Sequence, residues 1–194
     1  MRNLRLVLWV AVAVAAMIGG ALLWRQSNAP LLKPVPTQVS FGGPFTLIDS
    51  GGQPFASSKL AGKPYAIFFG FTHCPDVCPT TLARLVKLRR QLGNEGAFQI
   101  VFVTVDPERD GPKEVGNYAD LFGSPIIGLT GSGSQIAQVK KDYGIFSEKV
   151  GTGDNYTIDH TATVLLFDGD QKFQSTIAPD ETDETAIAKL KKLT

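Results

Sequence analysis

The sequence has few side chains that offer sulfur or imidazole chemistry: two cysteines, two histidines and two methionines in 194 residues. Both methionines, Met1 and Met17, lie near the N-terminus, outside the region patterned as a folded domain, so a thioether metal site is excluded from that domain. The absence of a further cysteine argues against a peroxide-reducing enzyme, which would need one to resolve an oxidised thiol. All thiol chemistry must therefore come from one pair, Cys74 and Cys78.

The chain also lacks a basic surplus. Three of its 19 Lys and Arg residues fall within residues 1–25, which leaves 16 basic against 18 acidic residues and a net charge of about −2 for the remainder. A nucleic-acid-binding domain carries a strong excess of positive charge. No nucleic acid partner is therefore expected.

The N-terminal segment differs sharply from the rest of the chain. Residues 6–24 form an uncharged stretch of 19 residues, and a helix of that length crosses a hydrocarbon core of about 30 Å. A cleaved signal peptide has a shorter apolar run, and the one candidate exit site here is followed by Pro30. Because basic residues before the stretch outnumber those after it, the N-terminus is expected in the cytoplasm. We predict an uncleaved transmembrane helix within an anchor over residues 1–25.

Prolines and weak apolar periodicity predict an extended tether over residues 26–40, followed by a single folded domain over residues 41–194. Only three residues precede Leu4, where the hydrophobic segment begins, so there is no room for a mitochondrial presequence. The expected location is a bacterial cytoplasmic membrane with one N-terminal span. The soluble domain would then lie in the periplasm, an oxidising compartment.

Strand-like and helix-like patterns alternate along the domain. Continuous apolar runs at 65–69 and 100–105 predict strands buried on both faces. Leucines at helical spacing after Cys78 predict a helix whose other face, with Lys87, Arg89 and Arg90, is solvated. The remaining predictions are a hairpin strand at 45–48 with its turn at 49–52, strands at 126–129, 163–167 and 173–177, and helices at 112–122, 134–143 and 181–193. This order predicts an α/β, thioredoxin-like fold.

The two cysteines stand in the segment 70–79 (GFTHCPDVCP), directly after a predicted strand. Each precedes a proline, which disfavours helical backbone for the cysteine itself. We therefore expect Cys74 in a loop and Cys78 in the first turn of the next helix. The positive end of that helix is expected to lower the thiol pKa and favour thiolate.

Two thiols at this spacing allow three kinds of chemistry: a disulfide, electron exchange with another disulfide, or binding of a thiophilic metal such as Cu(I) or Zn(II). Three residues separate the cysteines here, where a thioredoxin-type enzyme has two, and the wider loop leaves more room for a metal. A structural disulfide over so short a loop would stabilise the fold little, because the effect grows with loop length.

The remaining donor is a histidine. His160 precedes a predicted strand, at a point that a thioredoxin-like fold brings beside the cysteine loop, and the proline usual there is absent. Two thiolates and one imidazole suit Cu(I), and further ligands would adapt the site to Cu(II). Asp106 and Asp159 are candidates for residues that do not bind the metal themselves but hydrogen-bond to one of the metal-binding side chains. His73, beside Cys74 in sequence, is a weaker ligand candidate because its side chain should point away from that sulfur.

These motifs together resemble a known family. Residues 70–79, with residues 105–107 (VDP) and 159–162 (DHTA), are similar to the signatures of the Sco/SenC family. Its members are membrane-anchored copper proteins that help assemble the dinuclear copper centre of cytochrome c oxidase. The similarity runs from about residue 41 to the C-terminus.

The resemblance implies copper ligands at Cys74, Cys78 and His160, and places the family's acidic residue at Asp106. It implies a metallochaperone that delivers Cu(I), and also Cu(II), to the copper-bearing subunit of the oxidase, with another copper chaperone or a thiol reductant as a further partner. The alternative is a thiol-disulfide reductase, with Cys74 and Cys78 as catalytic residues, that keeps the oxidase's copper-ligand cysteines reduced. Whether the protein is an enzyme is left open between these two.

Overall fold

The structure is a computed structural model that describes residues 41–93 and 96–193, together with residues 9, 13–14, 17–21 and 24 near the N-terminus. The chain divides into two compact units, residues 1–39 and 40–194. The described residues of the first unit are helical, and Trp9, Met17 and Trp24 expose most of their side chains.

The predicted anchor and tether fall largely on residues that are not described. Most of the predicted anchor (1–25) and all of the predicted tether (26–40) lie outside the described residues. Within the described part of the chain, no helix has both the length and the apolar character needed to cross a membrane.

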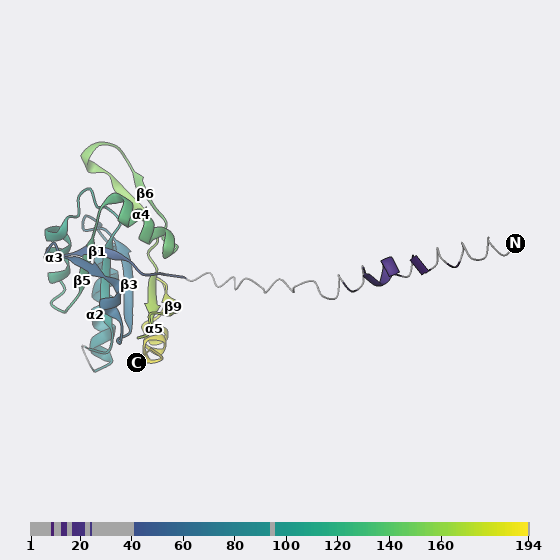
Figure 1. The fold of residues 1–194 in the computed structure, drawn as a ribbon. Coiled ribbons are helices and arrows are strands. Elements are labelled where there is room, and N and C mark those ends of the chain that lie inside the picture. Colours follow the sequence, from purple (N-terminus) through teal and green to yellow (C-terminus); the bar gives the residue numbers. More distant parts are fainter. Residues whose placement is uncertain are drawn as a thin grey trace. The chain divides into compact units, whose positions relative to one another are not determined.

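A seven-stranded sheet runs through the described domain in the order β2-β1-β5-β4-β3-β8-β9 (Figure 1). Its central strands, β3 (Tyr65–Gly70), β4 (Gln99–Thr104) and β5 (Ile127–Thr130), run parallel. Antiparallel strands complete both sides: β1 (Thr46–Asp49) and β2 (Pro54–Ala56) beside β5, and β8 (Val164–Phe167) and β9 (Phe173–Ile177) beside β3. The predicted mixed α/β order and the hairpin after residue 45 are confirmed.

The helices are arranged around this sheet. Helices α2 (Val77–Gln91) and α3 (Pro112–Asp120) each connect neighbouring parallel strands in the same direction, so right-handed crossovers place both on one face. Helix α5 (Asp183–Lys191) packs beside α2, and α4 (Gly133–Asp142) packs near β1. The short 3₁₀ turns are η1 (Ser57–Leu60) and η2 (Gly153–Asn155).

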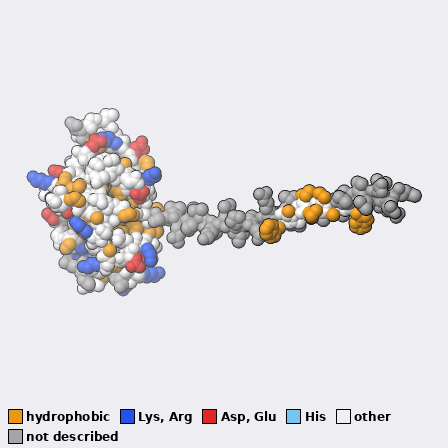
Figure 2. All heavy atoms as spheres, viewed as in Figure 1, with side chains coloured by type: hydrophobic (Ala, Val, Ile, Leu, Met, Phe, Trp, Pro, Cys, Tyr) orange, Lys and Arg blue, Asp and Glu red, His pale blue; other side chains and the backbone are white. Residues whose placement is uncertain are grey.

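The central strands form the core. Every residue of β3 is buried, and Phe68 and Phe69, which point to opposite faces, are both 0% exposed. The prediction that this strand is buried on both faces is confirmed. Charged side chains of both signs are interspersed over the face of the domain seen in Figure 2.

One surface assignment is wrong. Arg89 was expected on the solvated face of its helix, but it is only 2% exposed. Its guanidinium donates hydrogen bonds to Ser124 Oγ at 2.5 Å and to the carbonyl of Pro125 at 2.8 Å. The reason is its register: Arg89 lies one turn after the buried Leu85, on the same stripe of α2.

A two-stranded sheet, β6 (Ser147–Val150) and β7 (Thr157–His160), was not predicted from the sequence. Three of the four β6 residues are exposed, so the segment lacks the apolar alternation that identifies a half-buried strand. Its pairing joins Ser147 to His160 and fixes the position of that histidine at the end of β7.

Candidate metal centre

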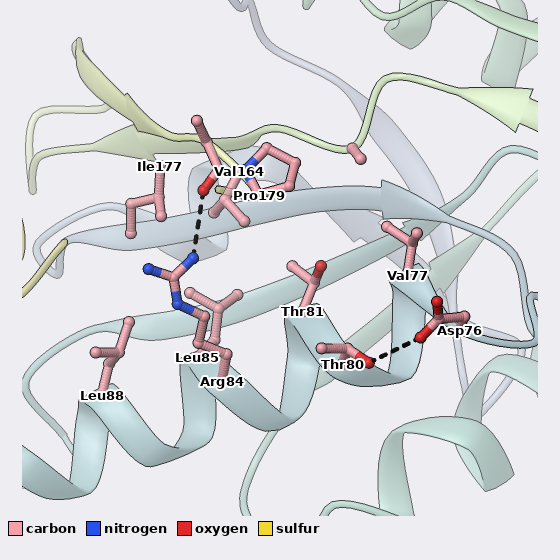
Figure 3. A pocket seen from close by; sticks show the side chains of 12 residues that line it. Asp76, Val77, Thr80, Thr81, Arg84, Leu85, Leu88, Val164, Ile177 and Pro179 are labelled. Carbon is pink, nitrogen blue, oxygen red and sulfur yellow. Dashed lines mark hydrogen bonds between the residues drawn. The ribbon is translucent and has the colours of Figure 1, made fainter. Parts of the chain in front are cut away.

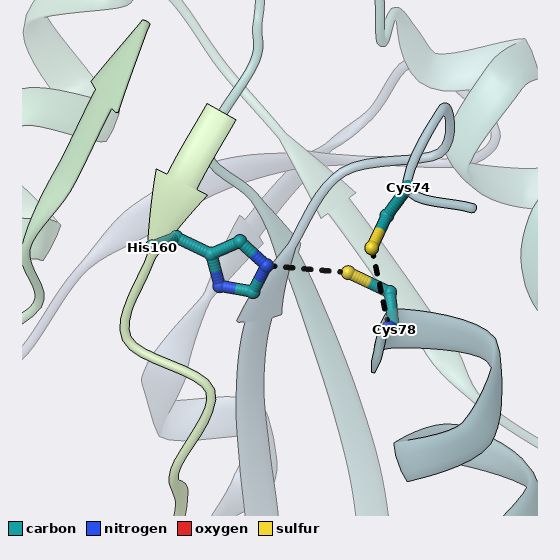
Figure 4. Close-up of side chains that lie close together, drawn as sticks. All are labelled: Cys74, Cys78 and His160. Carbon is teal, nitrogen blue, oxygen red and sulfur yellow. Dashed lines mark hydrogen bonds between the residues drawn. The ribbon is translucent and has the colours of Figure 1, made fainter. Parts of the chain in front are cut away.

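The side chains of Cys74, Cys78 and His160 converge, with their donor atoms all within 4.8 Å of one another (Figure 4). The Sγ of Cys78 lies 3.4 Å from Nε2 of His160, and the backbone N–H of Cys78 donates to Sγ of Cys74 at 3.3 Å. Cys78 is completely buried, whereas Cys74 and His160 are partly exposed. The group is therefore accessible from the side of Cys74 and His160.

The strand, loop and helix around the cysteines place both sulfurs. Cys74 lies in the loop after β3 and Cys78 is the second residue of α2, as predicted. Pro79 is tolerated in the first turn because N–H groups there have no helical partner. At Gly70, a Cβ atom would lie only 2.7 Å from Sγ of Cys78. Glycine at this position therefore leaves the space that the sulfur occupies.

A buried carboxylate ties the cysteine loop to the sheet. Asp110 is 0% exposed. It accepts hydrogen bonds from the backbone N–H and the hydroxyl of Thr72, at 2.9 and 2.6 Å, and from the hydroxyl of Thr104 at 2.6 Å. Sequence reasoning missed Asp110. The available signal was its place in residues 105–110, at the edge where the carboxyl ends of the parallel strands meet.

The imidazole of His160 is held in one tautomer. Its Nδ1 lies 3.0 Å from the carbonyl oxygen of Thr161, and because a carbonyl only accepts, Nδ1 carries the proton. The lone pair of Nε2 then faces Cys78 and accepts a hydrogen bond from its thiol. The ring packs edge-on against Phe68 and Phe71, at centroid distances of 6.0 and 5.8 Å. Burial lowers the pKa of His160 and so favours the neutral, metal-binding form.

The expected thiolate character of Cys78 is not what the structure shows. Burial, and next the hydrogen bond with Cys74, raise the pKa of the Cys78 thiol well above its ordinary value. Desolvation of the charged form therefore outweighs the influence of the helix N-terminus. The free protein holds Cys78 as a neutral thiol at neutral pH.

The other predicted site residues lie around this group without contacting its donor atoms. Asp106 is buried and accepts a hydrogen bond from the hydroxyl of Tyr156 at 2.7 Å. Asp159 is exposed on β7 and does not orient His160. The Nδ1–H of His160 donates to the Thr161 carbonyl. His73 is exposed, with its Nδ1 3.1 Å from the Thr72 hydroxyl.

A pocket of about 160 Å³ lies beside the site, along the first turns of α2 (Figure 3). Val77, next to Cys78, and Ala162, two residues after His160, both line it. Arg84 occupies one wall, and its guanidinium donates to the carboxylate of Asp183 at 2.8 Å and to main-chain carbonyls of the loop after β9. Since that guanidinium is occupied internally, the pocket presents mainly apolar surface.

A family model described as SCO1/SenC matches residues 34–194. The chain belongs to the SCO1/SenC family. Its relatives include an SCO2-like protein of Rickettsia conorii, which is 37% identical over 180 residues, covering 86% of this chain and 87% of that protein.

Solved Sco structures have the same fold. Bradyrhizobium japonicum ScoI with copper bound is 42% identical with a TM-score of 0.72, covering 79% of this chain and 99% of that one. Yeast Sco1 with copper bound is 32% identical with a TM-score of 0.70, covering 79% of this chain and 87% of that one. The predicted family and its mixed α/β, thioredoxin-like fold are confirmed.

Proposed function

We propose that this chain is a copper carrier that holds the metal through the sulfurs of Cys74 and Cys78 and Nε2 of His160. The observation that carries this proposal is the convergence of the three donor atoms within 4.8 Å. Two thiolates and an imidazole form a soft donor set that suits Cu(I). The copper-bound structures of related Sco proteins support the same choice of metal.

The carrier delivers its copper to the copper-bearing subunit of cytochrome c oxidase. The Sco family is one of cytochrome c oxidase assembly proteins, which supports an oxidase partner. Three protein donors leave room for a ligand of the acceptor to approach from the exposed side of Cys74. Loading requires Cys78 to release its proton, so metal binding is coupled to pH.

The N-terminal segment anchors the carrier. In this proposal residues 1–25 sit in a bacterial cytoplasmic membrane, residues 26–40 form a tether, and the domain over residues 41–194 lies in the periplasm. Exposed apolar side chains on the described helical residues, including Trp9 and Trp24, support a lipid-facing role. Anchoring donor and acceptor to one membrane raises their effective concentration.

The decisive test is Cu(I) affinity, measured on the reduced protein by competition with a chromophoric chelator under argon. The wild type should bind one copper tightly, and Cys74→Ser and His160→Ala should each weaken binding by at least about tenfold. His73→Ala is the matched control, because it removes the exposed neighbouring imidazole and should leave affinity unchanged. Absence of competitive binding by the wild type would reject the copper function.

A second candidate function is thiol-disulfide reduction, which the adjacency of two free thiols favours. Cys74, the more exposed thiol, would attack a partner disulfide and form a mixed disulfide. Cys78 would then displace the second partner thiol, leaving an oxidised Cys74–Cys78 pair and two electrons transferred. An external thiol reductant must then reduce the Cys74–Cys78 disulfide back to two thiols. Reductase activity that survives His160→Ala, while copper binding is lost, would identify this role.

A further inference from the structure

The segment that follows β4 contacts both halves of the candidate site. On the cysteine side, the carboxylate of Asp110 accepts hydrogen bonds from the N–H and the hydroxyl of Thr72, two residues before Cys74. On the histidine side, the carboxylate of Asp106 accepts a hydrogen bond at 2.7 Å from the hydroxyl of Tyr156, the residue directly before β7. Both carboxylates are buried, so water competes little for these contacts.

One hydroxyl group joins the two contacts. Thr104, the last residue of β4, is 0% exposed. Its hydroxyl donates to the carboxylate of Asp110 at 2.6 Å and accepts the main-chain N–H of Asp106 at 2.9 Å. A continuous set of contacts therefore runs from Thr72 in the cysteine loop, through Thr104, to Tyr156 at the start of the hairpin strand.

A guanidinium makes a second connection between the two halves. Arg109 pairs with the carboxylate of Asp106, stacks on the ring of Tyr156 and donates to the Tyr156 carbonyl. It also lies over the ring of Phe71, 5.9 Å from the ring centre. Phe71 in turn packs edge-on against the imidazole of His160. The hairpin is therefore held against the same segment that holds the cysteine loop.

The place of the imidazole depends on where β7 begins. His160 is the last of the four residues of β7, and Tyr156 directly precedes the first. An extended strand of this length is short and stiff, so a shift at its start moves the histidine at its end. Metal-binding side chains must be held within about 0.5 Å of their productive positions. A small movement of the anchored tyrosine is therefore enough to weaken a bond from His160 to a metal.

We propose that Thr104 is a positioning residue for copper binding. Its hydroxyl fixes Asp106, and through it the hairpin that carries His160, relative to the Asp110 carboxylate that holds the cysteine loop. The inference rests on the proposed copper function. Without this hydroxyl, Asp110 keeps both hydrogen bonds from Thr72, so the cysteine loop stays in place and the histidine side is loosened. The effect on copper binding is therefore exerted through His160.

The test measures the Cu(I) affinity of the full chain by chelator competition for two variants of Thr104. Thr104→Val replaces the hydroxyl by a methyl group of similar size and should weaken Cu(I) binding about threefold or more. Thr104→Ser keeps the hydroxyl and should retain the wild-type affinity. In a His160→Ala background, Thr104→Val should cause no further loss, because the side chain that it positions is absent.

A second pair of variants tests the histidine side without changing Thr104. Tyr156→Phe and Tyr143→Phe each remove one hydroxyl that donates from a buried tyrosine, to Asp106 and to the carbonyl of Gly43 respectively. Both should lower the melting temperature. Only Tyr156→Phe should weaken Cu(I) binding, because the ring of Tyr143 packs against Phe69, on the face of β3 opposite to the site.

Four results would contradict the proposed role of Thr104. Wild-type affinity in both Thr104→Val and Tyr156→Phe would overturn it and leave the copper function intact. Equal weakening by Thr104→Val and Thr104→Ser would show that the hydroxyl is not the cause. An undiminished effect of Thr104→Val in the His160→Ala background would show that Thr104 acts on the fold as a whole. A wild type that binds no copper would overturn both proposals.

Discussion

The two halves of the candidate site are held in different ways. The loop that carries the cysteines is tied to the core through the fully buried carboxylate of Asp110, which accepts three hydrogen bonds from Thr72 and Thr104. The β6–β7 hairpin, which ends at His160, has β6 mostly exposed and is paired with no strand of the main sheet.

Contacts nearer the surface hold the loop end of that hairpin, next to Tyr156, together with one buried hydrogen bond from the Tyr156 hydroxyl to Asp106. Arg109 lies 3.6 Å from the centre of the Tyr156 ring and donates to the Tyr156 carbonyl at 3.0 Å. Lys149 lies over the same ring at 3.9 Å and pairs with the exposed Glu108. Water and salt weaken such contacts more than they weaken a buried network. We therefore expect the histidine half of the site to open more easily than the cysteine half.

The largest expected effect is on the cysteine half. Asp110→Ala would leave the Thr72 N–H and two hydroxyls buried without their acceptor, and should lower the free energy of unfolding by about 3 kcal/mol or more. Urea denaturation measures this change. Asp170→Ala, at an exposed carboxylate, is the control and should stay within about 0.5 kcal/mol of the wild type. A loss below about 1 kcal/mol in Asp110→Ala would show that this network does not anchor the loop.

The next effect concerns the histidine half. Arg109→Ala removes the cation–π contact, the hydrogen bond to the Tyr156 carbonyl and the ion pair with the buried Asp106, and should cost about 2–3 kcal/mol. Hydrogen exchange should quicken at the amides of β7 and remain slow in β3. Lys149→Ala removes an exposed ion pair and a second contact with the Tyr156 ring. It removes no buried ion pair and no main-chain hydrogen bond, so it should have a smaller effect. Equal acceleration in β3 and β7 would contradict the difference between the two halves.

The smallest effect is a pH dependence. Because burial lowers the pKa of His160 in the folded protein, the unfolded chain, with a pKa of about 6.5, takes up a proton more readily. The stability that depends on neutral His160 is therefore fully present above about pH 6.5 and is lost as the pH falls below that value. Unfolding midpoints of the reduced protein should fall more steeply with decreasing pH for the wild type than for His160→Gln. Identical slopes in the wild type and His160→Gln would refute the burial argument.

Much of the site follows from local chemistry that can be read along the chain. The prolines after Cys74 and Cys78 argued against a single regular helix that carries both sulfurs, and the apolar run before Gly70 identified the buried strand that leads to them. The loop and first-turn positions predicted for the two cysteines match the structure. These features depend on neighbouring residues, so sequence reasoning reaches them.

Other features depend on residues far apart in the sequence. The polar β6 strand gives no local signal, and it forms by pairing with β7. The roles of Asp110 and Arg89 likewise depend on partners that are distant in sequence, Thr72 and Ser124 among them. Hydrophobic periodicity does not identify such partners, since it reports only which face of an element is buried.

The sequence alone predicted the candidate donor set, because two cysteines and one distal histidine were the available soft ligands of the domain, and it indicated the family through the motifs around them. The tertiary structure decided the protonation state of Cys78 and how accessible each of the two sulfurs is. Burial keeps Cys78 as a thiol although it stands at a helix N-terminus, and it leaves Cys74 as the more exposed sulfur. The physical reason is desolvation, which depends on the atoms packed around a group and not on its neighbours along the chain.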